Sequence, residues 1–342
     1  MLQLLFVLGV LVVAGCGDQH QTRPDAPGGQ GGKGDAPIDA PVDAGAVSTD
    51  AGDPNLLSMQ GVYGDFTNRT LPSDAIPYTV NYDLWADGAT KRRWLILPPG
   101  SAPIDNSNQD RWIFPEGTRV VKEFTRDGLL VETRIVERVG GTSPTYSLRT
   151  YVWRADGVDA DLTVDGATNV RGTAHVAPTG AQCTACHQGE VGKVLGFSAV
   201  QLSTAMLTML SSTNKLSVPI PAGTTFGPTG ATATVEALGY LHGNCGHCHN
   251  PNGIAGSFIN MNLKLHAAST AATQEPGYLT TVNANVQFNG AGATKRVEPM
   301  NPANSAVLKR LSIRGTNQMP LIATETVDAT GVTTVTTWIN SL

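Results

Sequence analysis

The sequence is poor in charged residues, aromatic residues and cysteine. Charged residues make up 15% and aromatic residues 6% of the 342 positions, and there are five cysteines. The stretch 1–54 carries seven aspartates against Arg23 and Lys33, which accounts for the net charge of −5; the remaining 21 basic and 21 acidic residues cancel. A neutral body without a basic stripe argues against nucleic-acid binding.

Long apolar runs are absent after the N-terminus. The opening stretch MLQLLFVLGVLVVAGC is too short for a membrane span and is typical of a secretory signal. Its end, VAGC, resembles a bacterial lipobox, in which Cys16 would become the lipidated first residue. Gly17, rather than aspartate, follows that cysteine and favours outer-membrane sorting. We expect a signal peptide over residues 1–15 and an exported protein, lipid-anchored in the cell envelope and facing the periplasm or the cell surface.

Aromatic residues are also missing from residues 17–55, where Asp, Ala, Pro and Gly dominate. Such a composition cannot bury enough apolar surface to offset the entropy of ordering. We therefore expect residues 16–55 to form a disordered tether behind the lipidated cysteine.

Strand-like runs follow from residue 56 to residue 175. They are rich in β-branched and aromatic residues and read RWLILPPG, TRVVKEF, LLVETRIVERV and LRTYVWRA. In the third run apolar and charged positions alternate until Val136, where the pattern slips and predicts a bulge. Several short strands at this spacing predict an N-terminal β-sandwich-like domain.

Helical patterns dominate after residue 176. Apolar residues recur at helical spacing in four segments, 196–210, 234–245, 304–313 and 333–342, and residues 212–233 are typical of a loop. The chain is thus expected to be multidomain, with a mainly α-helical domain over residues 176–342.

The four cysteines after Cys16 fall into two C-x-x-C-H motifs. The first is Cys183, Cys186 and His187, and the second is Cys245, Cys248 and His249. Cysteines three residues apart on a helical turn can form thioethers to both vinyl groups of a haem, while the adjacent histidine ligates the iron. The motifs predict two covalently bound c-type haems in a cytochrome c-type domain.

Two other interpretations use the same cysteines. A zinc site from both pairs is disfavoured because Cys186 and Cys245 lie much further apart in the sequence than the cysteine pairs of ordinary zinc ribbons. Two local disulfides would suit an oxidising compartment. Both leave His187 and His249 without a role, and we interpret His242 and His247 as bystanders, the latter facing solvent or a haem propionate.

The sixth iron ligands can be predicted in part. Met319, followed by proline and then a terminal helix with Trp338, is the candidate opposite His249, and His/Met ligation raises the reduction potential. Opposite His187 the sequence leaves several candidates open, namely Met206, Met209, His175, Met300 and His266.

The chain resembles a bacterial family of diheme c-type cytochromes with an N-terminal β-domain, often lipid-anchored. The resemblance covers about residues 61–342 and rests on NYDLWADGATKRRWLILPPG, WIFPEGTRVVKEF, YVWRADGVDADL, QCTACHQGEVGKVLGF, YLHGNCGHCHNPNG and the closing MPLI and WINSL. It implies haem attachment at both motifs and Met319 as a ligand. The stretch EPMNPANS departs from the Pro-Gly-Asp-Pro that the family tends to have there.

The β-rich part offers weaker signals. Lys91, Arg92 and Arg93 beside Trp94 could form a docking or sugar-binding patch with two further tryptophans, Trp85 and Trp112, but we favour core tryptophans and a solvated strand edge. Glu132 and Arg134 are interpreted as a structural charge network rather than as an acid/base pair.

Three functions are compatible with these residues. The favoured one is an electron-transfer protein, not an enzyme, that passes single electrons between redox partner proteins through its haems. A diheme peroxidase would need an open iron site, and a redox or ligand sensor would report haem state. Two low-spin haems inert to peroxide and carbon monoxide would indicate the carrier.

Overall fold

A computed structural model describes residues 53–140, 145–288 and 291–342. The expected signal peptide, Cys16 and nearly all of the expected tether lie outside these ranges. Among the helices of the three ranges, none has the length and apolar character needed to cross a membrane.

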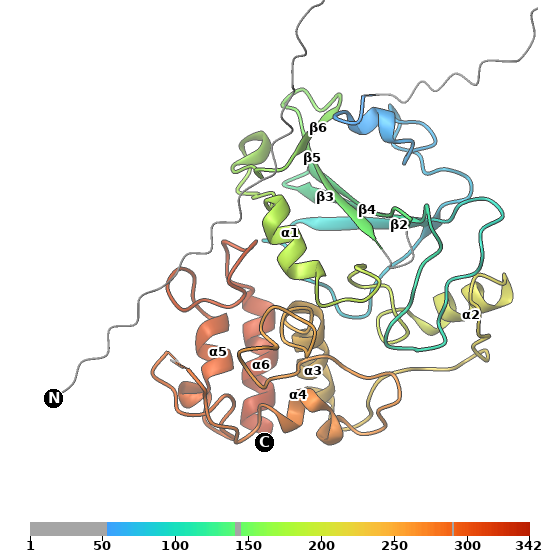
Figure 1. Cartoon of the computed structure of the whole chain (residues 1–342). Helices are drawn as coiled ribbons and strands as arrows, with labels where there is room; N and C mark the ends of the chain where they lie inside the picture. The colour runs from blue at the N-terminus through green and yellow to red at the C-terminus, as the bar shows by residue number, and fades with distance from the viewer. Residues whose placement is uncertain (1–52, 141–144, 289–290) are drawn as a thin grey trace, which may run out of the picture. The chain divides into compact units, whose positions relative to one another are not determined.

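Six strands form one antiparallel sheet in which each strand pairs with its neighbour in sequence (Figure 1). The strands are β1 (Ile76–Pro77), β2 (Thr90–Ile96), β3 (Arg119–Arg126), β4 (Leu129–Arg138), β5 (Tyr146–Trp153) and β6 (Ala160–Thr163). The four predicted strand runs are β2 to β5. The register shift lies between Phe124 and Thr125, whose partners are Glu132 and Leu130, so it is not at Val136 as predicted.

The fold-class prediction is wrong. The described residues form a single six-stranded sheet rather than a sandwich, and with 23% helix they contain no mainly α-helical cytochrome domain. The α-helices of these residues are short: α1 (Gly180–His187), α2 (Thr204–Ser212), α3 (Thr232–Asn244), α4 (Pro276–Leu279), α5 (Ala306–Leu311) and α6 (Ala329–Ser341). Single-turn 3-10 segments add η1 (Leu57–Gln60), η2 (Val170–Gly172), η3 (Ala272–Gln274) and η4 (Pro302–Asn304).

Loops and short helices cover both faces of the sheet. Because they bury its apolar side chains, no second sheet is needed to do so. On one face Trp94 and Ile135 pack with Leu57 and Val62 from the segment before β1. On the other face, one end of the sheet is apolar and carries Leu95, Val120 and Val136. It packs against the segment from residue 194 to residue 220, which includes α2. A sheet face must bury its apolar side against some other element, and here loops and one helix do so.

The helices after residue 230 share a second core, where α3, α5 and α6 lie together (Figure 1). Trp338 of α6 is fully buried in it. Three of the four predicted helices are confirmed as α3, α5 and α6 within a few residues. The fourth begins late, at Thr204, because the Ser203 side chain accepts a hydrogen bond from the Met206 N–H and caps α2 there.

The crossing of α3 and α6 depends on Gly331. A Cβ at this position would lie 2.1 Å from Cζ of Tyr240, well inside van der Waals contact. We expect Gly331→Ala to lower the free energy of unfolding by about 1–3 kcal/mol, measured by urea denaturation. Gly180→Ala is the control, because the nearest atom to a Cβ there is 3.7 Å away, and it should not destabilise the protein. Equal effects would contradict the close helix contact.

Candidate cofactor sites

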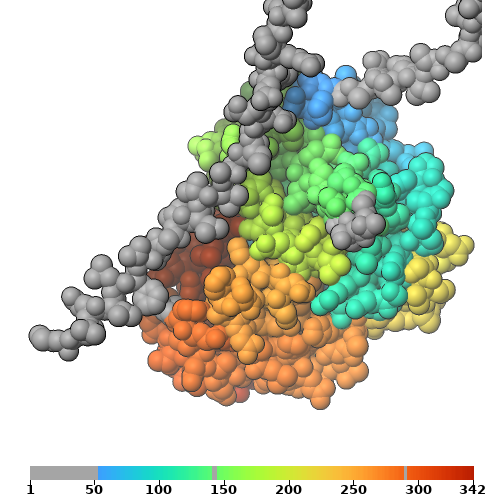
Figure 2. Space-filling model, in the orientation of Figure 1, coloured from blue at the N-terminus to red at the C-terminus, as the bar shows by residue number. Residues whose placement is uncertain are grey.

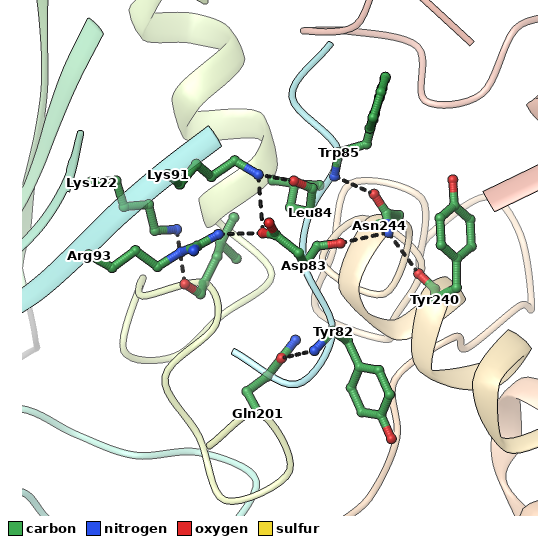
Figure 3. Close-up of polar contacts among 11 residues, drawn as sticks. Tyr82, Asp83, Leu84, Trp85, Lys91, Arg93, Lys122, Gln201, Tyr240 and Asn244 are labelled. Atoms are coloured by element: carbon green, nitrogen blue, oxygen red, sulfur yellow. Dashed lines mark hydrogen bonds and ion pairs between the residues drawn. The ribbon is translucent and has the colours of Figure 1, made fainter. Parts of the chain in front are cut away.

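The second C-x-x-C-H motif begins where α3 ends. Cys245 follows Asn244, the last residue of α3, and the backbone N–H of His249 donates to the Cys245 carbonyl at 2.8 Å, which adds a further helical turn. The Asn244 side chain accepts from the Trp85 N–H at 2.7 Å and donates to the Asp83 carbonyl at 3.0 Å (Figure 3). These bonds join the motif to the segment that leads into β2.

Cys245 and His249 line a pocket with a cavity volume of about 90 Å³, and Met319 lines the same pocket from a distant part of the sequence. The other lining residues are mostly apolar: Leu241, Ile259, Met261, Leu263, Val286, Gln287, Phe288, Arg296, Ala306, Val307, Arg310 and Leu311. The lining is mostly apolar with a few polar groups, as in ligand pockets, but the cavity is smaller than the roughly 300–1,000 Å³ that such pockets commonly enclose, so it would have to widen around a flat cofactor. Met261 was not singled out from the sequence, since a lone methionine carries no pattern that marks it as a pocket residue.

Burial keeps His249 neutral. Desolvation, and then the charges of His247 and Arg296, lower the pKa of His249 to about 4. Its Nδ1 is buried and has no hydrogen-bond partner in the described structure. A neutral imidazole is the form that ligates metals, so the side chain suits the role of an iron ligand.

Met319 is held by a hydrogen bond to α5 and by hydrogen bonds within its own loop. Its N–H donates to the Arg310 carbonyl at 2.9 Å, and the Gln318 side chain donates to the Pro320 and Thr324 carbonyls. The position of the thioether beside the pocket therefore depends on the whole segment from residue 318 to residue 326.

The first motif occupies α1, which packs against β5 (Figure 1). Thr179 and Gln182 form a capping box at its start. At its end the Nδ1 of His187 lies in hydrogen-bonding contact with the Lys193 carbonyl, which leaves Nε2 as the nitrogen available to a metal. Burial lowers the pKa of His187 to about 3, so this imidazole is also neutral.

Three side chains from the two motifs converge. One ligand atom each of Cys186, His247 and Cys248 lies within 4.8 Å of the others, and both thiols are free. His247 is buried, so the expectation that it faces solvent is wrong. On the molecular surface the segment after α1 adjoins the segment after α3 (Figure 2), and both line one pocket. The separation of the two cysteine pairs in the sequence argued against a shared metal site. That argument failed because distance along the chain does not measure distance in the fold.

The candidates for the first distal ligand lie in different surroundings. Met206 and Met209 pack against the apolar core beneath the sheet, and Met300 is 67% exposed. His266 lines a second pocket of about 500 Å³, whose lining is both polar and apolar. His175 is buried, and its Nε2 contacts Glu132 at 2.8 Å. None of these placements identifies the ligand opposite His187.

The β-strand cations do not form the expected solvated edge. The side chains of Lys91 and Arg93 are only 5% and 8% exposed. Trp94 and Trp112 are buried core residues, as predicted, and Trp85 donates its indole N–H to the Thr326 carbonyl at 3.0 Å. Glu132 and Arg134 form an ion pair, with Arg134 donating to the carboxylate at 2.9 Å.

His242 gives the protein a pH-dependent stability. Its Nδ1 accepts from the Leu265 N–H at 3.0 Å, and burial lowers its pKa to about 3. Between pH 6.5 and pH 3 the unfolded chain protonates this histidine while the folded chain does not, so acid destabilises the fold. His242→Gln should reduce the dependence of the unfolding free energy on pH by up to about 1.4 kcal/mol per unit, measured by urea denaturation from pH 7 to pH 4.5. Parallel curves for both proteins would refute this.

No family model, no curated protein and no solved structure matches the chain. Any functional conclusion therefore rests on the residues and pockets described above.

Proposed function

We propose that the protein is an exported, lipid-anchored diheme c-type cytochrome that transfers single electrons and is not an enzyme. The observation that carries the proposal is the pocket shared by Cys245, His249 and Met319. A thiol for attachment, a neutral imidazole and a thioether thus meet at one apolar space, although Met319 is far from His249 in the sequence. This is the donor set of a His/Met-ligated c-type haem.

The residues around this pocket fit that group in charge as well. Arg296 and Arg310 are the charged residues of the lining and suit the carboxylates of a haem. His249 would ligate the iron, Met319 would be the sixth ligand, and the apolar side chains would exclude water. The Cys248 thiol does not line the pocket and lies instead with Cys186, so its attachment requires a turn of the side chain.

The first motif also has residues that fit a haem. His187 is neutral and oriented by the Lys193 carbonyl, and the Cys183 sulfur lies 3.8 Å from the Thr150 hydroxyl on the sheet. Arg134 acts electrostatically on both thiols of this motif. When bound, the haems would supply reversible one-electron chemistry. The protein would orient them and shield them from water, and redox partner proteins would exchange electrons with them.

Haem counting and redox spectroscopy test the proposal. The full-length exported protein should give two haems per chain by pyridine haemochrome, and both should be low-spin and unreactive with peroxide and carbon monoxide. A chain without haem would refute the proposal. A high-spin haem that binds carbon monoxide would exclude the simple carrier and favour an enzyme or a sensor.

The lipid anchor rests on the sequence and can be tested separately. Radiolabelled palmitate should enter the wild-type protein, and Cys16→Ala should abolish this labelling and release the protein from membranes. Labelling that persists in Cys16→Ala would exclude the proposed anchor without affecting the haem assignment.

A further inference from the structure

Three cationic side chains lie in one row across the sheet. Arg93 of β2 pairs with Lys122 of β3, and Lys122 pairs with Arg134 of β4, so all three project from the same face. The next row on that face is apolar, formed by Leu95, Val120, Val136 and Leu148. We name Arg93, Lys122 and Arg134 the cationic row. Like charges directly opposite one another destabilise a sheet, so the row calls for a compensating group.

Among the described residues, fewer carboxylates than cations lie in this region of the sheet. Asp83 accepts from both Lys91 and Arg93 (Figure 3), but its side chain is 56% exposed and is therefore a weak partner. Glu132 pairs with Arg134. The cationic row and Lys91 together make four cations, and they face two carboxylates, those of Asp83 and Glu132. This leaves an excess of two positive charges.

Lys122 is the cation without a carboxylate in the part of the chain that the structure describes. Its amino group donates to the Leu195 carbonyl at 3.0 Å (Figure 3). Burial, and then the charges of Arg93 and Arg134, lower the pKa of Lys122 to about 7. A buried charge is normally paired, so a protonated Lys122 requires an anion that the chain itself does not provide.

The cationic row lies beside the first C-x-x-C-H motif. Lys122 binds the Leu195 carbonyl and His187 binds the Lys193 carbonyl, so one short loop holds both side chains. Thr150, which pairs with Arg134 across β4 and β5, has its hydroxyl 3.8 Å from the Cys183 sulfur. A group attached to this motif would therefore lie within reach of the row.

We propose that the cationic row binds the two propionate carboxylates of the first haem. This inference rests on the proposed function. Two carboxylates carry two negative charges, which matches the excess of cations. Charge-assisted hydrogen bonds from Arg and Lys to carboxylates are short and strong, and the surrounding burial strengthens them further. The row then both binds the cofactor and favours the reduced, less positive iron.

The test compares Lys122→Met with Lys122→Arg in the haem-loaded full-length protein. Lys122→Met should lower the midpoint potential of one haem, leave the other unchanged and lower the free energy of unfolding. Lys122→Arg keeps the charge and should retain the wild-type potentials. Arg149→Met is the matched control, because Arg149 pairs with Glu137 on the opposite face of the same sheet. It should not change either potential.

With and without carboxylates bound to the row, Lys122→Met should change the free energy of unfolding in opposite directions. If no carboxylate binds the row, Lys122→Met removes an uncompensated buried charge, which should raise the free energy of unfolding and leave both potentials unchanged. That result would overturn the inference while the haem count of two upholds the proposed function. A wild-type protein that lacks the first haem would overturn both, and the pyridine haemochrome assay distinguishes the two cases.

Discussion

Replacement of Met319 by alanine should lower the midpoint potential of one haem strongly and leave the other unchanged. Met319 lines the same pocket as His249, and a thioether ligand raises the potential of a histidine-ligated haem because it stabilises the reduced iron. Axial ligands set haem potentials over a range of about 0.8 V, so the loss of one should be among the largest single-residue effects in this protein. A potentiometric titration followed by absorption measures it.

The same pocket provides a matched control. Met261 also lines it, and Met261→Ala removes an equal side-chain volume without removing the expected ligand. Met261 is half-buried, so we expect Met261→Ala to cost less than the about 2–5 kcal/mol of a fully buried methionine, with both potentials retained. A large change in potential for Met261→Ala and none for Met319→Ala would assign the sixth ligand to Met261 instead. Carbon monoxide should bind to the reduced Met319→Ala protein, since the substitution opens a position on the iron.

The strands and most helices were predictable from local pattern, but the way they pack was not. Alternation along β4 predicted that Val131 and Ile135 share a face, but the register shift beside Val131 leaves the two residues in different core clusters. The slip at Val136 has a simple explanation in the structure. Glu132, Arg134 and Val136 lie on one face in continuous register, and that face is charged in the middle and apolar at one end. The predicted sandwich failed because loops, rather than a second sheet, bury these faces.

The residues of the candidate sites also divide into those that local sequence patterns predict and those that only the fold brings together. Local spacing identified Cys245 and His249, and the terminal segment suggested Met319, all of which the fold brings to one pocket. Contacts that need the whole fold were missed. No local pattern signals the approach of Cys186 to Cys248. The burial of Lys91 and Arg93 was missed as well, because a run of three cations ordinarily lies in solvent.

Asp87 links the strand-bearing half of the protein to the loop that carries Met319. Its carboxylate accepts hydrogen bonds from the Glu325 and Thr326 N–H groups and from the Thr324 and Thr326 hydroxyls, at 2.9–3.1 Å. Only 4% of the residue is exposed. Removal of this acceptor takes a partner from the buried Thr324 hydroxyl and from the partly buried donors of Glu325 and Thr326, and a donor left unpaired by burial costs about 1–3 kcal/mol.

We therefore expect Asp87→Ala to lower the free energy of unfolding by at least about 3 kcal/mol and to weaken methionine ligation as the loop loosens. Asp156→Ala is the control, because Asp156 is exposed and accepts only from the nearby Val158 N–H; its effect should stay within about 1 kcal/mol. Urea denaturation measures stability, and the potential of the haem proposed at His249 measures ligation. Unchanged potential with lowered stability would show that Asp87 supports the fold alone. A shift toward the Met319→Ala value would show that one buried carboxylate, far from Met319 in the sequence, helps to set the redox properties of the site.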